Sequence, residues 1–289
     1  MDSLHLPHHQ QTTQPFCALL TLSLDQRVGN VHVISKANMN TFGGPMMVAN
    51  TLHACTILLK MSKEWDWFIN LSASDYPLVA QDDMLYTFSS LPRNLNFVEH
   101  TRKLEWKEYI DRLPLPLLAL LLIDGHSSAW MILPREFRVL YMGWNDLPRT
   151  LLMYYTNFVS SPEGYFQTVI CNTPEFISTI VNHDLHYITW DNTPKQHTRK
   201  LSANDGSKKI TANVSFARKF KYDDALLDGI DAELLQWSNE DFVPGGWCSA
   251  SPPSSEVVDS SLLKPGQGAE RLGKLMDKMV HFEVFTKHH

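Results

Sequence analysis

The stretch Trp65-Asp66-Trp67-Phe68-Ile69-Asn70-Leu71, followed by Ser72-Ala73-Ser74-Asp75-Tyr76-Pro77, decides the fold class of this chain. Its first half is short and strongly apolar, which is typical of a buried strand, and its second half is rich in loop-forming residues. Just before it, residues 45–61 predict a helix, because Pro45 can open one and apolar residues then recur at helical spacing. A helix that leads into a buried strand indicates an α/β domain.

The same alternation continues along the chain. Further strands are expected at residues 31–34, 95–99, 130–133 and 186–190, and further helices at 82–90, 135–140, 148–158, 162–171, 224–235 and 270–279. Strands that alternate with helices predict a central, mainly parallel sheet. Residues 1–28 are expected to form a disordered leader, and the Gly-, Pro- and Ser-rich residues 249–268 a loose segment before the last helix.

The composition of the chain limits the classes of function and partner that it can have. The chain has 289 residues, 44% of them hydrophobic, and a net charge of −6, which supports an ample core and argues against nucleic acid as a partner. Its four cysteines lack C-x-x-C spacing, and we find no Asp-x-Asp, zinc-type histidine or Gly-rich phosphate motif. We therefore expect no metal site and no bound cofactor. No apolar run reaches the ~20 residues of a membrane helix, so the sequence predicts neither anchor nor signal peptide.

One carboxylate stands out in Ser160-Ser161-Pro162-Glu163-Gly164-Tyr165-Phe166. Ser161 and Pro162 are typical of a helix N-cap and first turn, which places Glu163 where a loop meets a rigid element. A carboxylate in that position can take a proton from a substrate hydroxyl. An acid there also offsets the positive end of the helix dipole, so position alone leaves a purely structural role open.

Two further acids follow predicted strands. Asp75 comes after the strand at 65–71, and ligands in open α/β sheets gather beyond the carboxyl ends of strands. It would contact a ligand, organise the site, or only cap the loop before Pro77. Glu99 ends the strand at 95–99, where it could bond a sugar hydroxyl or simply belong to a solvated helix start.

A basic run near the other end of the chain is a candidate anion site. Phe216-Ala217-Arg218-Lys219-Phe220 sets two cations between two aromatic residues, a pattern suited to a diphosphate. An ordinary surface lysine is the alternative. If the chain binds a nucleotide sugar, lysine or arginine would have to offset its phosphate charge, because no carboxylate pair suits a metal ion.

These runs, in this order, resemble plant members of the core-2/I-branching glycosyltransferases, glycosyltransferase family fourteen. The matching stretches lie between Gly29 and Trp247 and comprise residues 36–38, 47–54, 68–77, 97–100, 128–131, 146–166, 191–197, 216–220 and 243–248. The plant members that they resemble most are beta-glucuronosyltransferases. Those enzymes move glucuronic acid from UDP-glucuronate to galactan chains of arabinogalactan proteins in the Golgi.

The resemblance implies a GT-A-like fold and an inverting, metal-independent displacement. By the same resemblance Glu163 is the general base, and the UDP-sugar is the donor substrate. The other implied site residues are Lys219 and Lys195 for the donor diphosphate, and Asp75, Glu99 and Trp130 for substrate binding.

The resemblance also divides the chain into unmatched residues 1–28, a transferase domain at 29–248 and a tail at 249–289. The family's nucleotide-binding beginning has no counterpart before Gly29, and the domain is shortened near 113–127. We therefore expect a GT-A-like fold that is incomplete in its nucleotide-binding part, with membrane attachment only through a segment absent here. A catalytically impaired relative that acts as a binding or partner protein, or an N-acetylglucosaminyltransferase, is the alternative.

Overall fold

The computed structural model describes residue 34 and residues 45–62, 65–100, 128–137, 146–155, 161–191, 198–202, 205, 212–221, 223–236 and 265–280. Several expectations lie outside these residues. They are the leader at 1–28, the domain boundaries at 28/29 and 248/249, the shortened stretch at 113–127 and the diphosphate candidate Lys195.

The described elements confirm an α/β protein. In chain order they are α2 (Met46–Met61), β1 (Trp67–Ile69), β2 (Tyr76–Pro77), α3 (Gln81–Ser89), β3 (Asn96–Val98), β4 (Met131–Pro134), α6 (Asp146–Tyr154), the 3-10 turn η3 (Ser161–Glu163), α7 (Tyr165–Cys171), α8 (Pro174–Ile177), β5 (Ile180–Val181), β6 (His186–Ile188), β7 (Phe216–Arg218), α10 (Ala225–Ile230), the π-helical turn η5 (Asp231–Leu235) and α11 (Gln267–Val280).

The strands form two mixed sheets, with orders β1-β4-β3-β5 and β2-β7-β6. The pairs β3–β5 and β6–β7 are parallel, whereas β1–β4, β3–β4 and β2–β7 are antiparallel. The expectation of one central, mainly parallel sheet is therefore wrong for the strands that the structure describes. Apolar patterning predicts which face of a strand is buried but carries no information on the direction of its neighbour.

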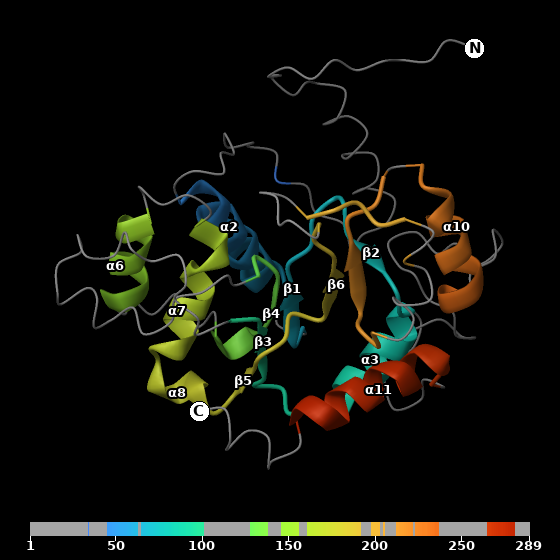
Figure 1. The fold of residues 1–289 in the computed structure, drawn as a ribbon. Coiled ribbons are helices and arrows are strands. Elements are labelled where there is room, and N and C mark those ends of the chain that lie inside the picture. Colours follow the sequence, from blue (N-terminus) through green and yellow to red (C-terminus); the bar gives the residue numbers. More distant parts are fainter. Residues whose placement is uncertain are drawn as a thin grey trace, which may run out of the picture.

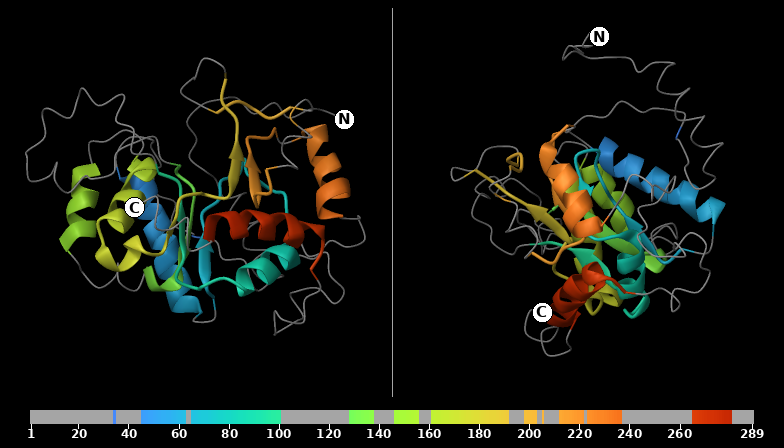
Figure 2. Two further views of the ribbon diagram at one scale, coloured as in Figure 1. Left: turned by 60° about the horizontal axis from the view of Figure 1, so that its bottom comes forward. Right: turned by 90° about the vertical axis from the view of Figure 1, so that its right-hand side faces the viewer.

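Helices cover both faces of the four-stranded sheet (Figures 1 and 2). Side chains alternate along β4, so that Met131 and Leu133 pack on the side of α2, α6, α7 and α8. Ile132, between them, packs on the opposite side with Phe97, α3 and α11. The first sheet therefore lies between two helical layers, and its edges are left for loops.

The terminal helix is part of this core. α11 begins at Gln267, before the expected residue 270, and buries Leu272 and Met276 against Met84 and Phe88 of α3. The second sheet packs against α10 and η5 through a third cluster that includes Ala217, Ile230 and Leu235. Residues 267 and 268, expected in the loose segment, thus belong to a packed helix.

The single helix expected over residues 162–171 is broken in two. Residues 161–163 form the 3-10 turn η3, and α7 starts only after Gly164. A side-chain carbon at residue 164 would lie 2.5 Å from Tyr155 Oη, so this close approach requires glycine. The break leaves Glu163 on its own short turn ahead of a buried helix.

Within the described parts of the chain, we find no helix with the length and apolar character needed to cross a membrane.

Candidate functional site

The loops of the candidate site meet at one edge of the first sheet. The parallel strands β3 and β5 end together there, and His100 N donates to Asn182 Oδ1 at 2.8 Å. The antiparallel β4 begins at the same edge, where Asn70 Nδ2, just after β1, donates to Ala129 O at 3.0 Å. This edge is where an open α/β sheet gathers ligands.

Asp75 is the buried centre of this edge, with a side chain only 1% exposed. Oδ2 accepts hydrogen bonds from Trp130 Nε1 at 2.7 Å and from Ser72 N at 2.6 Å. Oδ1 accepts from Ser72 Oγ at 3.0 Å and lies 3.4 Å from Arg218 Nε. Because protein donors occupy both oxygens, the geometry favours an organising role for Asp75 over direct contact with a ligand.

Three side chains surround the Asp75 carboxylate. They are Trp130, just before β4, His186 in β6 and Arg218 in β7. The guanidinium of Arg218 stacks 3.7 Å from the ring centre of Trp130. His186 lies beside the same indole, stacks on Phe216 at 5.2 Å between centroids, and places Nε2 3.9 Å from Asp75 Oδ2. We call Asp75, Trp130, His186 and Arg218 the Asp75 cluster.

Burial lowers the pKa of the two basic side chains in this cluster, Arg218 and His186. Desolvation lowers the pKa of Arg218, and the carboxylates of Asp75 and Asp184 oppose that change. Desolvation also lowers the pKa of His186, against the raising effects of Asp184 and Asp75. The cluster therefore holds a neutral histidine beside a close Asp75–Arg218 ion pair at neutral pH.

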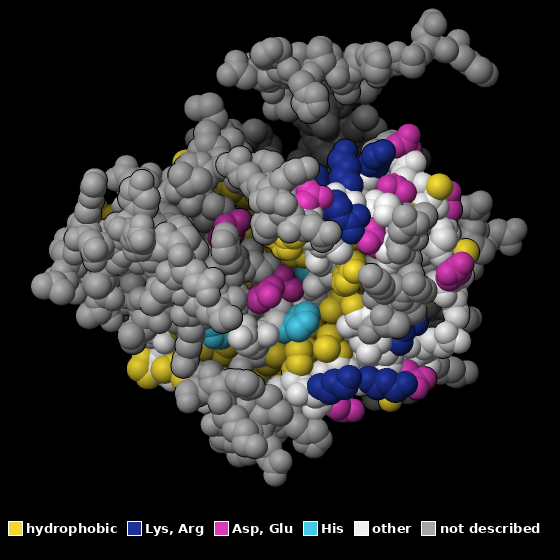
Figure 3. Space-filling view, viewed as in Figure 1, with side chains coloured by type: hydrophobic (Ala, Val, Ile, Leu, Met, Phe, Trp, Pro, Cys, Tyr) yellow, Lys and Arg dark blue, Asp and Glu magenta, His cyan; other side chains and the backbone are white. Residues whose placement is uncertain are grey.

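Glu99 lies on the exposed rim of the same edge. It follows the last residue of β3, as the sequence predicted, and its pKa is raised by partial desolvation and by the nearby Asp184 carboxylate. Figure 3 shows acidic and histidine side chains side by side at the centre of this face, with hydrophobic side chains around them. The rim thus offers the carboxylate of Glu99 to a polar ligand.

Glu163 is exposed at the end of η3, on a rigid support. Ser161 and Pro162 are buried beneath it, and Tyr165 of α7 donates from Oη to Pro148 O at 3.0 Å. The next turn of α7 returns to the sheet edge, where Gln167 Nε2 donates to Ser128 O at 2.5 Å. Glu163 therefore combines access to solvent with a fixed backbone, which suits a general base.

Lys219 is half-buried directly after β7. Its carbonyl accepts from Leu201 N at 2.9 Å, and Phe220 N next to it donates to Ser74 O at 3.4 Å. These bonds hold the basic run beside the loop that carries Asp75. The structure thus brings Asp75, Trp130 and the segment of Lys219 together. Glu99 directly follows β3, and Glu163 lies on η3, which contacts α2 and α7.

No sequence motif points to His186, and none gives Arg218 a role separate from that of Lys219. Alternation along β7 holds the signal for Arg218, because Phe216 and Arg218 share a face while Ala217 faces the third hydrophobic cluster. His186 gives no such signal, since a lone histidine at the start of a strand matches no motif.

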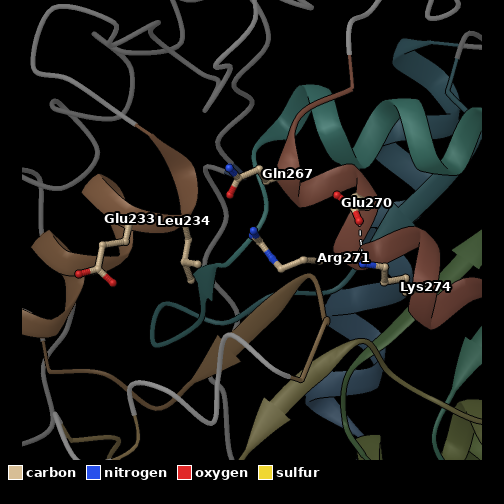
Figure 4. Close-up of a pocket in the computed structure, with 6 residues that line it drawn as sticks. All are labelled: Glu233, Leu234, Gln267, Glu270, Arg271 and Lys274. Carbon is tan, nitrogen blue, oxygen red and sulfur yellow. Dashed lines mark hydrogen bonds and ion pairs between the residues drawn. The ribbon is translucent and has the colours of Figure 1, made fainter.

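The structure also bears on whether the chain has a metal site or a second hollow that could hold a ligand. Among the residues that the structure describes, no group of three His, Cys, Asp or Glu side chains is placed to hold a metal ion. A surface hollow of about 410 Å³ lies between η5 and α11 (Figure 4), lined by Glu233, Leu234, Gln267, Glu270, Arg271 and Lys274. Lys274 and Glu270 pair there at 2.7 Å, Arg271 donates to Leu78 O, and none of the predicted site residues lines the hollow.

Comparison with known proteins gives consistent matches. The family model described as Core-2/I-Branching enzyme matches residues 5–211 and so includes most of the segment that the motifs left unmatched. Beta-glucuronosyltransferases GlcAT14B and GlcAT14A of Arabidopsis thaliana are 49% and 47% identical, each over 91% of this chain. The chain covers 67% and 65% of them, about two thirds of their length. Xylosyltransferase 1 of Rattus norvegicus is 31% identical over a region that covers 59% of this chain and 22% of the length of that protein.

Proposed function

The chain belongs to the Core-2/I-Branching enzyme family of glycosyltransferases, as its motifs predicted, and from this premise we propose its reaction. It moves glucuronic acid from UDP-glucuronate to galactan chains of arabinogalactan proteins, with inversion and without a metal ion, in the Golgi. The observation that carries this proposal is the 49% identity, over 91% of the chain, to a protein named as a beta-glucuronosyltransferase.

In the proposed reaction Glu163 is the general base. Its carboxylate takes the proton of an acceptor hydroxyl while that oxygen attacks the anomeric carbon of the donor, and the bond to UDP breaks as UDP leaves with the electron pair. Support comes from the exposed position of Glu163 on a turn held by buried Ser161 and Pro162. A base of this kind contributes roughly 10²- to 10⁴-fold to the rate.

Cations take the place of a metal ion in this proposal. Lys219 offsets the diphosphate charge that grows as UDP leaves, and Lys195 is the second candidate. Support for this role comes from the hydrogen bond between Leu201 N and the Lys219 carbonyl and from the bond that joins Phe220, the next residue, to the loop that carries Asp75. Arg218 is already engaged with Asp75 and Trp130, so its role would be to fix the orientation of the Trp130 ring.

The two substrates would meet at the edge where the strands of the first sheet end. Glu99 and the exposed part of Trp130 would contact the substrates there, and Asp75 holds the Trp130 indole through a hydrogen bond of 2.7 Å. Aromatic faces and carboxylates of this kind suit sugar rings and their hydroxyls.

The test separates the base from the donor site. With UDP-glucuronate and a β-linked galactan, Glu163→Gln is expected to lower kcat by at least about 100-fold, with UDP affinity measured by calorimetry unchanged. Lys219→Ala is expected to weaken UDP binding about tenfold, because it removes one charged contact to the diphosphate.

Three outcomes would contradict the proposal. Transfer that survives in Glu163→Gln removes that residue as the base, and a strong loss of rate in EDTA contradicts metal independence. Absence of UDP binding to the folded chain removes the donor site altogether. Parallel assays with UDP-N-acetylglucosamine and UDP-xylose establish whether glucuronate is the preferred sugar.

A further inference from the structure

Asp184 is a buried carboxylate that no motif singled out. It lies in the short link between β5 and β6, where the chain passes from the first sheet to the second, and it is 1% exposed. Burying a charged group costs several kcal/mol unless its oxygens are well bonded. Its contacts therefore decide what it does.

Both oxygens of Asp184 are engaged by different elements. Oδ2 accepts a hydrogen bond from the hydroxyl of Ser128, three residues before β4. Oδ1 accepts from His186 N at 2.9 Å, and the Asp184 carbonyl lies 2.8 Å from His186 Nδ1. One carboxylate thus joins the beginning of β4 to the beginning of β6.

Ser128 in turn forms hydrogen bonds with two parts of the candidate site, Trp130 and helix α7. Its Oγ accepts from Trp130 N at 3.2 Å, and its carbonyl accepts from Gln167 Nε2 at 2.5 Å. Gln167 is buried in α7, four residues after Glu163. Asp184, Ser128 and Gln167 therefore form a chain of hydrogen bonds from the Asp75 cluster to the helix that follows the proposed base.

We propose that Asp184 is a positioning residue for sugar transfer. Acting through Ser128, it holds the η3–α7 segment, with Glu163, in register with Trp130 and the Asp75 cluster. This inference rests on the function proposed above for Glu163. A misplacement of about 1 Å in such a site can cost as much as 100-fold in rate, so a side chain remote from the substrates can control kcat.

Asp184→Asn tests the inference with little change of volume. The amide keeps one acceptor for His186 N but turns an N–H₂ donor where Ser128 Oγ now donates. We expect kcat to fall about tenfold, with the KM for UDP-glucuronate and the Kd for UDP nearly unchanged. Hydrogen exchange of the amides at residues 163–168 is expected to quicken, while exchange in α3 and α11 stays as it is.

Ser128 supplies the second variant and the rescue. Ser128→Ala removes the hydroxyl that joins Asp184 to Trp130 and is expected to lower kcat as Asp184→Asn does. Ser128→Thr keeps the hydroxyl and should recover most of the rate. The pair keeps the inference testable if Asp184→Asn fails to fold.

The matched control is Asp83→Asn, which alters another buried carboxylate. Asp83 accepts from Gly266 N at 2.5 Å in the α3–α11 layer, away from the sheet edge. A loss of kcat in Asp184→Asn no larger than in Asp83→Asn, or a loss that appears only as weaker UDP binding, would overturn the inference.

If the wild-type chain transfers no sugar, the proposed function fails, and the hydrogen-exchange data still decide whether Asp184 positions the η3–α7 segment. Unchanged exchange at residues 163–168 in both Asp184→Asn and Ser128→Ala would then exclude the positioning role.

Discussion

At the scale of single residues, the indole of Trp130 does two separate things. Its Nε1–H donates a hydrogen bond to the buried Asp75 carboxylate at 2.7 Å. The Arg218 guanidinium stacks over its ring, with Cζ 3.7 Å from the ring centre. Trp130→Phe removes the first contact and keeps a face for the second. Because a buried carboxylate then loses a donor, we expect the free energy of unfolding in urea to fall by about 1–3 kcal/mol.

Trp190→Phe is the control for that measurement, since Trp190 is 52% exposed and its replacement should change stability by less than about 0.5 kcal/mol. Equal losses in the two variants would mean that the bond to Asp75 adds nothing beyond the general effect of removing an indole.

The candidate site was predictable residue by residue only where a motif was present. Asp75 and Trp130 belong to family-like runs, and the structure brings them into contact. His186 and Asp184 lie in no motif, and their importance comes from burial and from partners distant in sequence. Such partners depend on how two sheets meet, which local spacing does not encode.

At the scale of elements, α11 shows how a helix near the end of the chain supports the sheet. Leu272 is fully buried between α3 and the sheet, in the cluster that also contains Phe97 and Ile132. Leu272→Ala removes this side chain and leaves a cavity, which typically costs about 2–5 kcal/mol. Thermal and urea unfolding would measure the loss.

Leu85→Ala on α3 is the matched control, because Leu85 is 40% exposed and its truncation should change stability by less than about 0.5 kcal/mol. If Leu272→Ala is as mild as this control, α11 does not belong to the cooperative core.

Helical periodicity predicted most elements well, and the errors have local causes. α2, α3 and α11 lie within a few residues of their expected bounds because each carries buried apolar side chains at helical spacing. The helix over 162–171 was wrong at Gly164, where the 3-10 turn gives way to α7, and the close approach of Tyr155 to this glycine depends on a contact between segments that helical spacing does not encode. Strand direction was wrong because apolar alternation looks the same in parallel and antiparallel neighbours.

At the scale of the whole molecule, the junction of the two sheets makes stability depend on pH. His183 and His186 lie at this junction, and desolvation lowers the pKa of both. A histidine whose folded pKa lies below its unfolded value of about 6.5 takes up its proton more readily when the chain unfolds. Its stabilising effect is complete above pH 6.5 and is lost as the pH falls toward the folded pKa.

The free energy of unfolding should therefore decrease between pH 7.5 and pH 5.5, by up to about 1.4 kcal/mol per pH unit for each histidine. Glu99 and Asp83 act in the opposite direction, because their raised pKa values let the folded chain bind protons more readily than the unfolded chain does. Urea titrations across this range, with His186→Gln beside the exposed His53→Gln, isolate the contribution of the junction. A shallower pH slope in His186→Gln alone is expected. The same slope in both variants would show that His186 does not contribute to the pH dependence, which would then come from His183 or from groups elsewhere in the fold.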